Sequence, residues 1–167
     1  MSRLHRIITP FLVAILLLVS ACSQQPPSRF DQAQRESTSK GSSAVVKESV
    51  AGSEFNKFFP PVTEGYQRIF SQEKKGFAEA KLKKDGKEVA VMSISDTINN
   101  PTAKNKFANS QKTIKGYPLV EQGTTASAVL VADRFQVKVL SRDSSFTASE
   151  REAWLAKFDL DGLSKLK

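Results

Sequence analysis

The stretch that most limits what this chain can fold into is FAEAKLKKDGKEVAVMSIS, residues 77–95. Its first part alternates small or apolar residues with charged ones, as a half-buried strand does. Asp85 and Gly86 then form a preferred pair for a two-residue hairpin turn. The run after the turn, residues 88–95, is apolar on both faces, which is typical of a buried strand. The stretch therefore predicts an antiparallel hairpin whose second strand is central in a sheet.

The remaining strands are predicted from the same kind of pattern. One strand, residues 66–72, precedes the hairpin, and three follow it at residues 117–122, 125–131 and 135–142. Pro118 favours an edge position for the first of these three, because proline cannot donate to the strand ladder. The sequence thus predicts six antiparallel strands.

Two helices are predicted, one after each group of three strands. The first spans residues 101–115, with Asn100 as its cap, Pro101 at its first position and Gly116 at its end. The second opens with a capping box at residues 147–150. The large apolar residues that these helices are expected to bury are Phe107, Trp154 and Phe158.

These elements predict an α+β domain at residues 54–167. The order βββα-βββα favours one six-stranded antiparallel sheet with both helices packed on one face. Residues 54–59, EFNKFF, have three phenylalanines at helical spacing, which predicts a helical turn that caps the core. An exposed aromatic binding patch is the alternative for this segment.

The first residues of the chain predict export. Residues 1–6 are basic, residues 7–19 are apolar and two small residues follow, which is the pattern of a secretory signal peptide at residues 1–21. The apolar run has 13 residues, fewer than the roughly 20 that a transmembrane helix needs. A signal peptide is therefore favoured over a membrane-spanning anchor.

The end of this segment, Val19 to Cys22, resembles the bacterial lipobox. The resemblance implies cleavage before Cys22, a diacylglycerol on its sulfur and attachment to a membrane of the cell envelope, facing the periplasm or the extracellular side. Two or more acyl chains hold a protein stably, whereas one holds it marginally. Ser23 stands where an aspartate often marks inner-membrane retention in this family, so the outer membrane is favoured. The alternative is an ordinary signal peptide followed by a cysteine by chance.

Residues 22–53 predict a lipidated cysteine followed by a flexible linker. They are rich in Ser, Gln, Lys and Glu and contain few large apolar residues, so they cannot bury enough surface to fold alone. A coil of about 30 residues has a root-mean-square span of roughly 30 Å. The domain is therefore expected to move off the membrane while it stays attached.

Composition excludes several kinds of chemistry. The chain has one histidine and one cysteine, His5 and Cys22, and both precede the predicted domain. This excludes Ser-His-Asp and Cys-His catalysis, Cys/His zinc sites, histidine-ligated haem and iron–sulfur clusters in that domain. No catalytic residue, metal ligand or cofactor is predicted, and the protein is not expected to be an enzyme.

The charge of the chain favours anionic partners. The net charge is +8, and it is +6 without the predicted signal peptide, which holds two arginines and no acid. Lipid headgroups, an acidic polymer or an acidic protein face would suit such a surface, whereas nucleic acid is not expected outside the cytoplasm. A basic surface that only keeps the protein in solution is the alternative.

The first candidate binding residues are Asp96, Asn99 and Asn100, in the stretch SDTINN. They come at the end of a predicted central strand and before a predicted helix, where an anion could sit on the helix terminus. The alternative is a turn in which these side chains bond to nearby backbone groups, a local use that is common for Asp and Asn.

The second candidate group is Asp133 and Arg134 at a hairpin tip, with Lys138 and Arg142 nearby along the next strand. Its alternative is a turn with solvated charges, since exposed charge pairs usually do little. A third candidate is the polar face of the sheet, which would be free if both helices cover the other face. The residues predicted on this polar face are Glu79, Lys81, Lys83, Gln136, Lys138 and Arg142.

The domain as a whole is similar to small lipoproteins of unknown function in bacterial envelopes, including cyanobacterial ones. The similarity lies in residues 76–97 and 129–143, each a strand–turn–strand unit, and it implies no catalytic residues. We therefore expect a non-enzymatic, lipid-anchored binding or assembly module with a protein or anionic envelope partner. A carrier of a small ligand or lipid, with a cavity between sheet and helices, is the alternative. A carboxylate-based hydrolase at Asp96 is the least favoured.

Overall fold

The computed structural model describes residues 49–62 and 65–167. The predicted signal peptide, Cys22 and nearly all of the predicted linker lie outside these residues. None of the helices in the described ranges has the length and apolar character needed to cross a bilayer.

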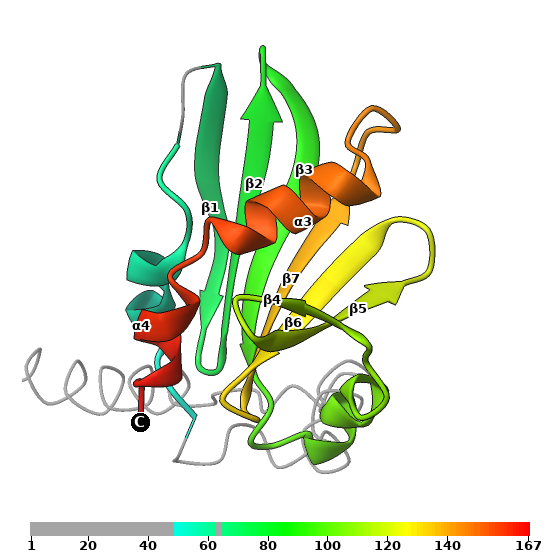
Figure 1. The fold of residues 1–167 in the computed structure, drawn as a ribbon. Coiled ribbons are helices and arrows are strands. Elements are labelled where there is room, and N and C mark those ends of the chain that lie inside the picture. The colour runs from blue at the N-terminus through cyan, green and yellow to red at the C-terminus, as the bar shows by residue number, and fades with distance from the viewer. Residues whose placement is uncertain (1–48, 63–64) are drawn as a thin grey trace, which may run out of the picture. The chain divides into compact units, whose positions relative to one another are not determined.

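In the described residues, seven antiparallel strands form one sheet in the order β1-β2-β3-β7-β6-β5-β4 (Figure 1). Two groups of consecutive strands, β1 to β3 and β4 to β7, join where β3 pairs with β7. The predicted antiparallel α+β architecture is confirmed, but the prediction of six strands is wrong. The bounds are β1 Tyr66–Lys74, β2 Phe77–Lys84, β3 Lys87–Asp96, β4 Lys112–Ile114, β5 Tyr117–Gln122, β6 Ala126–Val131 and β7 Phe135–Ser141.

Tight turns close the hairpins and fix their register. The predicted turn at Asp85 and Gly86 has φ values of 49° and 80°. Ala132 and Asp133 have φ values of 50° and 52° in the turn between β6 and β7. Positive φ at both central residues matches the right-handed twist of the flanking strands.

The predicted helix at residues 101–115 is the main error of the sequence analysis. Its first half is a short 3-10 helix, η2 (Pro101–Phe107), and its end is the extra strand β4. Lys115 and Gly116, with φ values of 50° and 82°, do not end a helix but turn β4 back onto β5. The β-branched residues of β4 favour a strand. Because β4 pairs with it, β5 is not the edge strand that Pro118 favoured.

One face of the sheet carries the main core. The helices α3 (Ala148–Ala156) and α4 (Leu160–Ser164) lie on this face together with the 3-10 helix η1 (Gly52–Phe58), and Figure 1 shows α3 running across the strands. The predicted capping box of α3 is confirmed by both of its hydrogen bonds. The three phenylalanines of residues 54–59 are buried here, which confirms the helical turn that caps the core.

The opposite face, which we name the outer face, carries a smaller cluster. Phe107 of η2 packs there against Ala128 and Leu130 of β6, whereas the alternate β6 residues Val129 and Val131 belong to the main core. The prediction that both helices share one face is therefore wrong. Since successive side chains of a strand point to opposite faces, a fully buried strand such as β6 needs cover on both.

Candidate functional site

Two predicted candidate residues from different parts of the chain form an ion pair at one end of the sheet. Asp96 ends β3, and Arg134 follows the turn between β6 and β7. Arg134 Nε donates to Asp96 Oδ1 at 3.1 Å, and Nη2 donates to Oδ2 at 2.8 Å. The Asp96 side chain is 0% exposed and that of Arg134 is 22% exposed. The pair is thus bidentate, a geometry that arginine and carboxylate groups match well.

The same carboxylate holds the beginning of the described chain. Val50 N donates to Asp96 Oδ2 at 3.3 Å, and the side chain of Asn99 donates to Ser49 Oγ. Gly76 N donates to Val50 O at 2.6 Å, and Asp96 N donates to Gly76 O at 2.8 Å. Ser49 and Val50, which fall in the last part of the predicted linker, are therefore bonded to the folded domain. We name this set the latch: Ser49, Val50, Gly76, Asp96, Asn99 and Arg134.

The pKa of Asp96 lies below its ordinary value. Burial acts to raise it, but the hydrogen bonds from Arg134, from Ile98 N and from Val50 N, with the charge of Arg134, outweigh that effect. The same hydrogen bond raises the pKa of Arg134. Both groups are therefore charged at neutral pH, and Asp96 is not tuned to donate a proton.

The remaining residues of the SDTINN stretch do not converge on a common point. Asn99 bonds to Ser49, while Asn100 Oδ1 accepts from Thr102 Oγ1 at 2.7 Å. Asp96 Oδ1 accepts from Ile98 N at 3.1 Å. These contacts match the alternative of local hydrogen bonding rather than an anion site at a helix terminus.

The structure places Lys138 and Arg142 away from the latch. Lys138 lies on the outer face, between Ser93 of β3 and Ala128 of β6. Arg142 Nε lies 3.7 Å from Glu88 Oε1, so its main partner is an acid beside the hairpin of β2 and β3. Candidate residues that the sequence grouped with Arg134 therefore do not form one site with it.

The predicted polar face of the sheet is confirmed by the register. Glu79 of β2, Ser93 of β3 and Lys138 of β7 lie side by side in one row across three strands. Lys81 Nζ pairs with Glu88 Oε2 at 3.1 Å. Neither Lys83 nor Lys138 has an acidic partner among the described residues. The outer face thus presents cations that the described part of the chain does not neutralise.

Further polar groups on the outer face also lack partners. The Oε1 atom of Gln136 is buried without a hydrogen bond within the described ranges. Lys106 of η2 lies near Lys138, and its pKa is lowered first by burial and second by the charge of Lys138. An unsatisfied buried polar atom and neighbouring like charges both disfavour the isolated domain. An anionic partner on this face would relieve the repulsion between Lys106 and Lys138.

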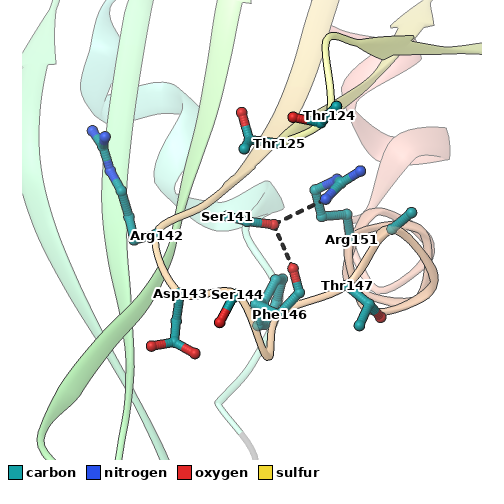
Figure 2. A pocket seen from close by; sticks show the side chains of 10 residues that line it. Thr124, Thr125, Ser141, Arg142, Asp143, Ser144, Phe146, Thr147 and Arg151 are labelled. Atoms are coloured by element: carbon teal, nitrogen blue, oxygen red, sulfur yellow. Dashed lines mark hydrogen bonds between the residues drawn. The ribbon is translucent and has the colours of Figure 1, made fainter.

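A pocket of about 330 Å³ lies at the start of α3 and contains an arginine that the sequence analysis missed. Figure 2 shows hydroxyl groups of several threonines and serines around it, with Arg142 pointing away from Arg151. Arg151 occupies the position three before Trp154 and seven before Phe158, so it falls in the apolar stripe of α3. A charged residue in such a stripe is the signal that would have identified it.

Arg151 is 3% exposed and joins α3 to three strands. Its Nε donates to Ser127 Oγ of β6 at 2.8 Å, its Nη1 to Ser141 Oγ of β7 at 3.0 Å and its Nη2 to Glu121 Oε2 of β5 at 2.8 Å. Ser127 Oγ in turn donates to Glu121 Oε1 at 2.9 Å. The guanidinium is therefore a structural bridge rather than a free anion receptor.

The other charges of this pocket are also paired. Asp143 bonds to Lys87, and the hydrogen bonds from Lys87 and then from Ser145 lower the pKa of Asp143 below its usual range. The pocket thus offers mainly hydroxyl groups and carries no unpaired charge in the described residues. The outer face, whose Lys83 and Lys138 have no acidic partner among the described residues, is therefore the better candidate for a binding surface.

No protein-family model matches the chain, and neither the curated proteins nor the solved structures include a significant match. Within the described ranges, no cluster of three or more His, Cys, Asp or Glu side chains is placed to hold a metal ion.

Replacing Asp96 with Asn should destabilise the domain by about 3 kcal/mol at pH 7, because it leaves Arg134 without its charged partner. The pKa of Asp96 is depressed in the folded state, so the stabilisation is complete above the unfolded-state value of about 4 and is lost as the pH falls through the lower folded-state value. The difference between Asp96→Asn and the native protein in urea unfolding should shrink below about pH 4. Asp133→Asn, which alters a pair whose carboxylate is 79% exposed, should change stability by less than about 1 kcal/mol. Equal effects of the two variants would contradict this assignment.

Replacing Arg151 with Met should lower the free energy of unfolding by about 3 kcal/mol, because Glu121, Ser127 and Ser141 lose a shared donor. Urea unfolding followed by the fluorescence of Trp154, which lies on the same helix, measures the change. Arg142→Met is the matched control, since Arg142 lines the same pocket but is 52% exposed. An Arg151→Met protein as stable as Arg142→Met would show that the bridge does not hold α3 to the sheet.

Proposed function

We propose that this protein is a lipid-anchored, non-enzymatic binding or assembly module of the bacterial cell envelope. In this proposal Cys22 carries the lipid, and the domain faces the periplasm or the extracellular side. The lipobox resemblance supports the anchor, and Ser23 favours the outer membrane. The latch supports the same organisation, because it bonds the end of the predicted linker to the sheet through Val50 and Asp96.

The observation that carries the binding role is the outer face of β2, β3 and β7. In the described residues, η2 lies against β5 and β6 on this face, whereas the helices of the main core lie on the other. Lys83 and Lys138 are left without an acidic partner among the described side chains. Charge complementarity of this kind steers association and selects partners. We infer an acidic protein surface or an anionic envelope component as the partner.

The interior of the domain gives less support to a carrier of small ligands. A carrier needs space between the sheet and the helices. Phe55, Leu155 and Phe158 occupy that region and are fully buried in one packed cluster. Close-packed interiors leave few voids larger than a water molecule.

The experiment is photo-crosslinking in intact cells, with the photoreactive residue at Gln67. This residue is exposed and pairs with Lys83 across the strands, so it reports on the outer face. The double variant Lys83→Glu and Lys138→Glu should reduce the main crosslinked product more than about tenfold, because an acidic partner would meet like charges. A photoreactive residue is needed because lysine-directed reagents would lose their own targets in this variant.

The matched control is Lys84→Glu with Lys157→Glu, which has the same charge change on the other side of the sheet. Lys84 lies over the ring of Tyr66 and Lys157 over that of Trp154, both of which pack on the main core. A product that falls equally in both double variants would contradict a binding role for the outer face. Cys22→Ala should release the protein from the membrane fraction, and the mass of the peptide that contains Cys22 checks the anchor directly.

A further inference from the structure

The end of the sheet that holds the latch is also the end at which the described chain begins. By register, the turn between β1 and β2, the end of β3 and the turn between β6 and β7 all lie at this end. The described chain begins at the same place, since Ser49 and Val50 bond to Asn99 and Asp96. An anchor at Cys22 would therefore be connected to the domain at this end.

A hollow of about 450 Å³ opens beside the latch. Its walls are mostly small residues, and Gly52 leaves no room for a side chain, because a Cβ there would lie 2.5 Å from the carbonyl oxygens of Lys74 and Phe77. Lys74 and Lys75 provide the cations of the hollow, and both are exposed. The complete lining is Ser49, Ala51, Gly52, Ser53, Glu73, Lys74 and Lys75.

The charge balance of the hollow favours an anion. Neither Lys74 nor Lys75 forms an ion pair with any residue that the structure describes. Lys74 Nζ lies 5.1 Å from the centre of the Phe77 ring. Glu73 is the one acid in the lining, and its Oε1 accepts from Asn56 Nδ2 at 2.7 Å. The lining thus contains two lysines that form no ion pair and one carboxylate that is already bonded to an amide.

We propose that this hollow binds the phosphate headgroups of anionic lipids in the membrane that holds the anchor. The inference rests on the proposed lipid anchor. The 26 residues between Cys22 and Ser49 belong to the predicted linker, and a coil of that length would span roughly 30 Å. A tether of this length gives an effective concentration in the millimolar range, so a weak headgroup site is enough to orient the domain. Lysines near an anionic surface add attraction that falls off within a Debye length.

This orientation complements the proposed binding role. With the latch end toward the membrane, the strands stand away from the surface and the outer face lies at their side. Lys83 and Lys138 then remain accessible to a partner that approaches along the envelope. The hollow lies at the end of the β1–β2 hairpin that holds its turn, whereas Lys83 lies toward the other end of the same strands.

The test uses the purified full lipoprotein reconstituted into vesicles of phosphatidylcholine with or without phosphatidylglycerol. A fluorophore is attached to Gln72→Cys near the hollow or to Gln67→Cys toward the far end of β1, and the lipids carry a headgroup-level quencher. Both glutamines are exposed residues of one strand, and their Cα atoms lie roughly 16 Å apart at the usual strand rise. We expect stronger quenching at residue 72 than at residue 67 in anionic vesicles only, and weaker quenching at high salt.

Lys74→Glu with Lys75→Glu should abolish this difference, since the two lysines favour the headgroup-bound orientation by about thirtyfold. Lys84→Glu with Lys87→Glu, at the other end of the hairpin strands, has the same charge change and should preserve the difference in quenching.

Equal quenching at residues 67 and 72, or a difference that survives Lys74→Glu with Lys75→Glu, would overturn the headgroup site. The mass of the Cys22 peptide is measured on the same sample: a lipidated cysteine with equal quenching overturns this inference alone, whereas an unlipidated cysteine overturns the anchor on which both proposals rest.

Discussion

The Asp96 carboxylate lies at the point where the two halves of the sheet meet. In the described sheet, the pairing of β3 with β7 is the one that links β1 to β3 with β4 to β7. Asp96 ends that pairing opposite Phe135, and its ion pair with Arg134 reaches across it. Thr97 reinforces the junction, because its backbone N and its Oγ1 both donate to Arg134 O, at 2.9 and 2.7 Å. A buried carboxylate without these donors would be strongly unfavourable, so the ion pair, the junction and the latch depend on one another.

A second buried charge stabilises the other end of β7. Arg151 bonds to Ser141 at that end and also to Glu121 and Ser127, which ties α3 to β5, β6 and β7. Both networks satisfy their charges within the domain. Lys83 and Lys138 on the outer face and Lys74 and Lys75 beside the latch are among the cations that form no ion pair with the described residues. This division is the reason for assigning binding to Lys83 and Lys138 rather than to the buried groups.

The sequence correctly predicted those elements whose conformation depends on residues close together in the chain. The hairpin of residues 77–95, the capping box of α3 and the alternation of β7 follow from turn preference, capping and period-two burial. The helix predicted at residues 101–115 was wrong, because β4 gains its hydrogen bonds by pairing with β5. Helix propensity describes only the local chain and takes no account of such a distant partner. Such tertiary pairing overrides weak local preference.

The candidate site shows the same limit. Asp96 and Arg134 were both selected from the sequence, but as members of separate groups, because only the β3–β7 register brings them together. Arg151 could have been found as a charge within an apolar helix stripe, although its three acceptors come from strands that the sequence does not align. Whether Cys22 carries lipid is independent of this geometry.

Amide hydrogen exchange of the full lipoprotein tests the central claim, that Asp96 bonds the start of the domain to the sheet. The amides of Val50 and Gly76 donate to Asp96 Oδ2 and to Val50 O. We predict that both exchange slowly, at rates close to those of β3, and that Asp96→Asn accelerates them far more than it accelerates the centre of β3. Val50 and Gly76 amides that exchange as fast as an unstructured peptide in the native protein would contradict the latch and the orientation inferred from it.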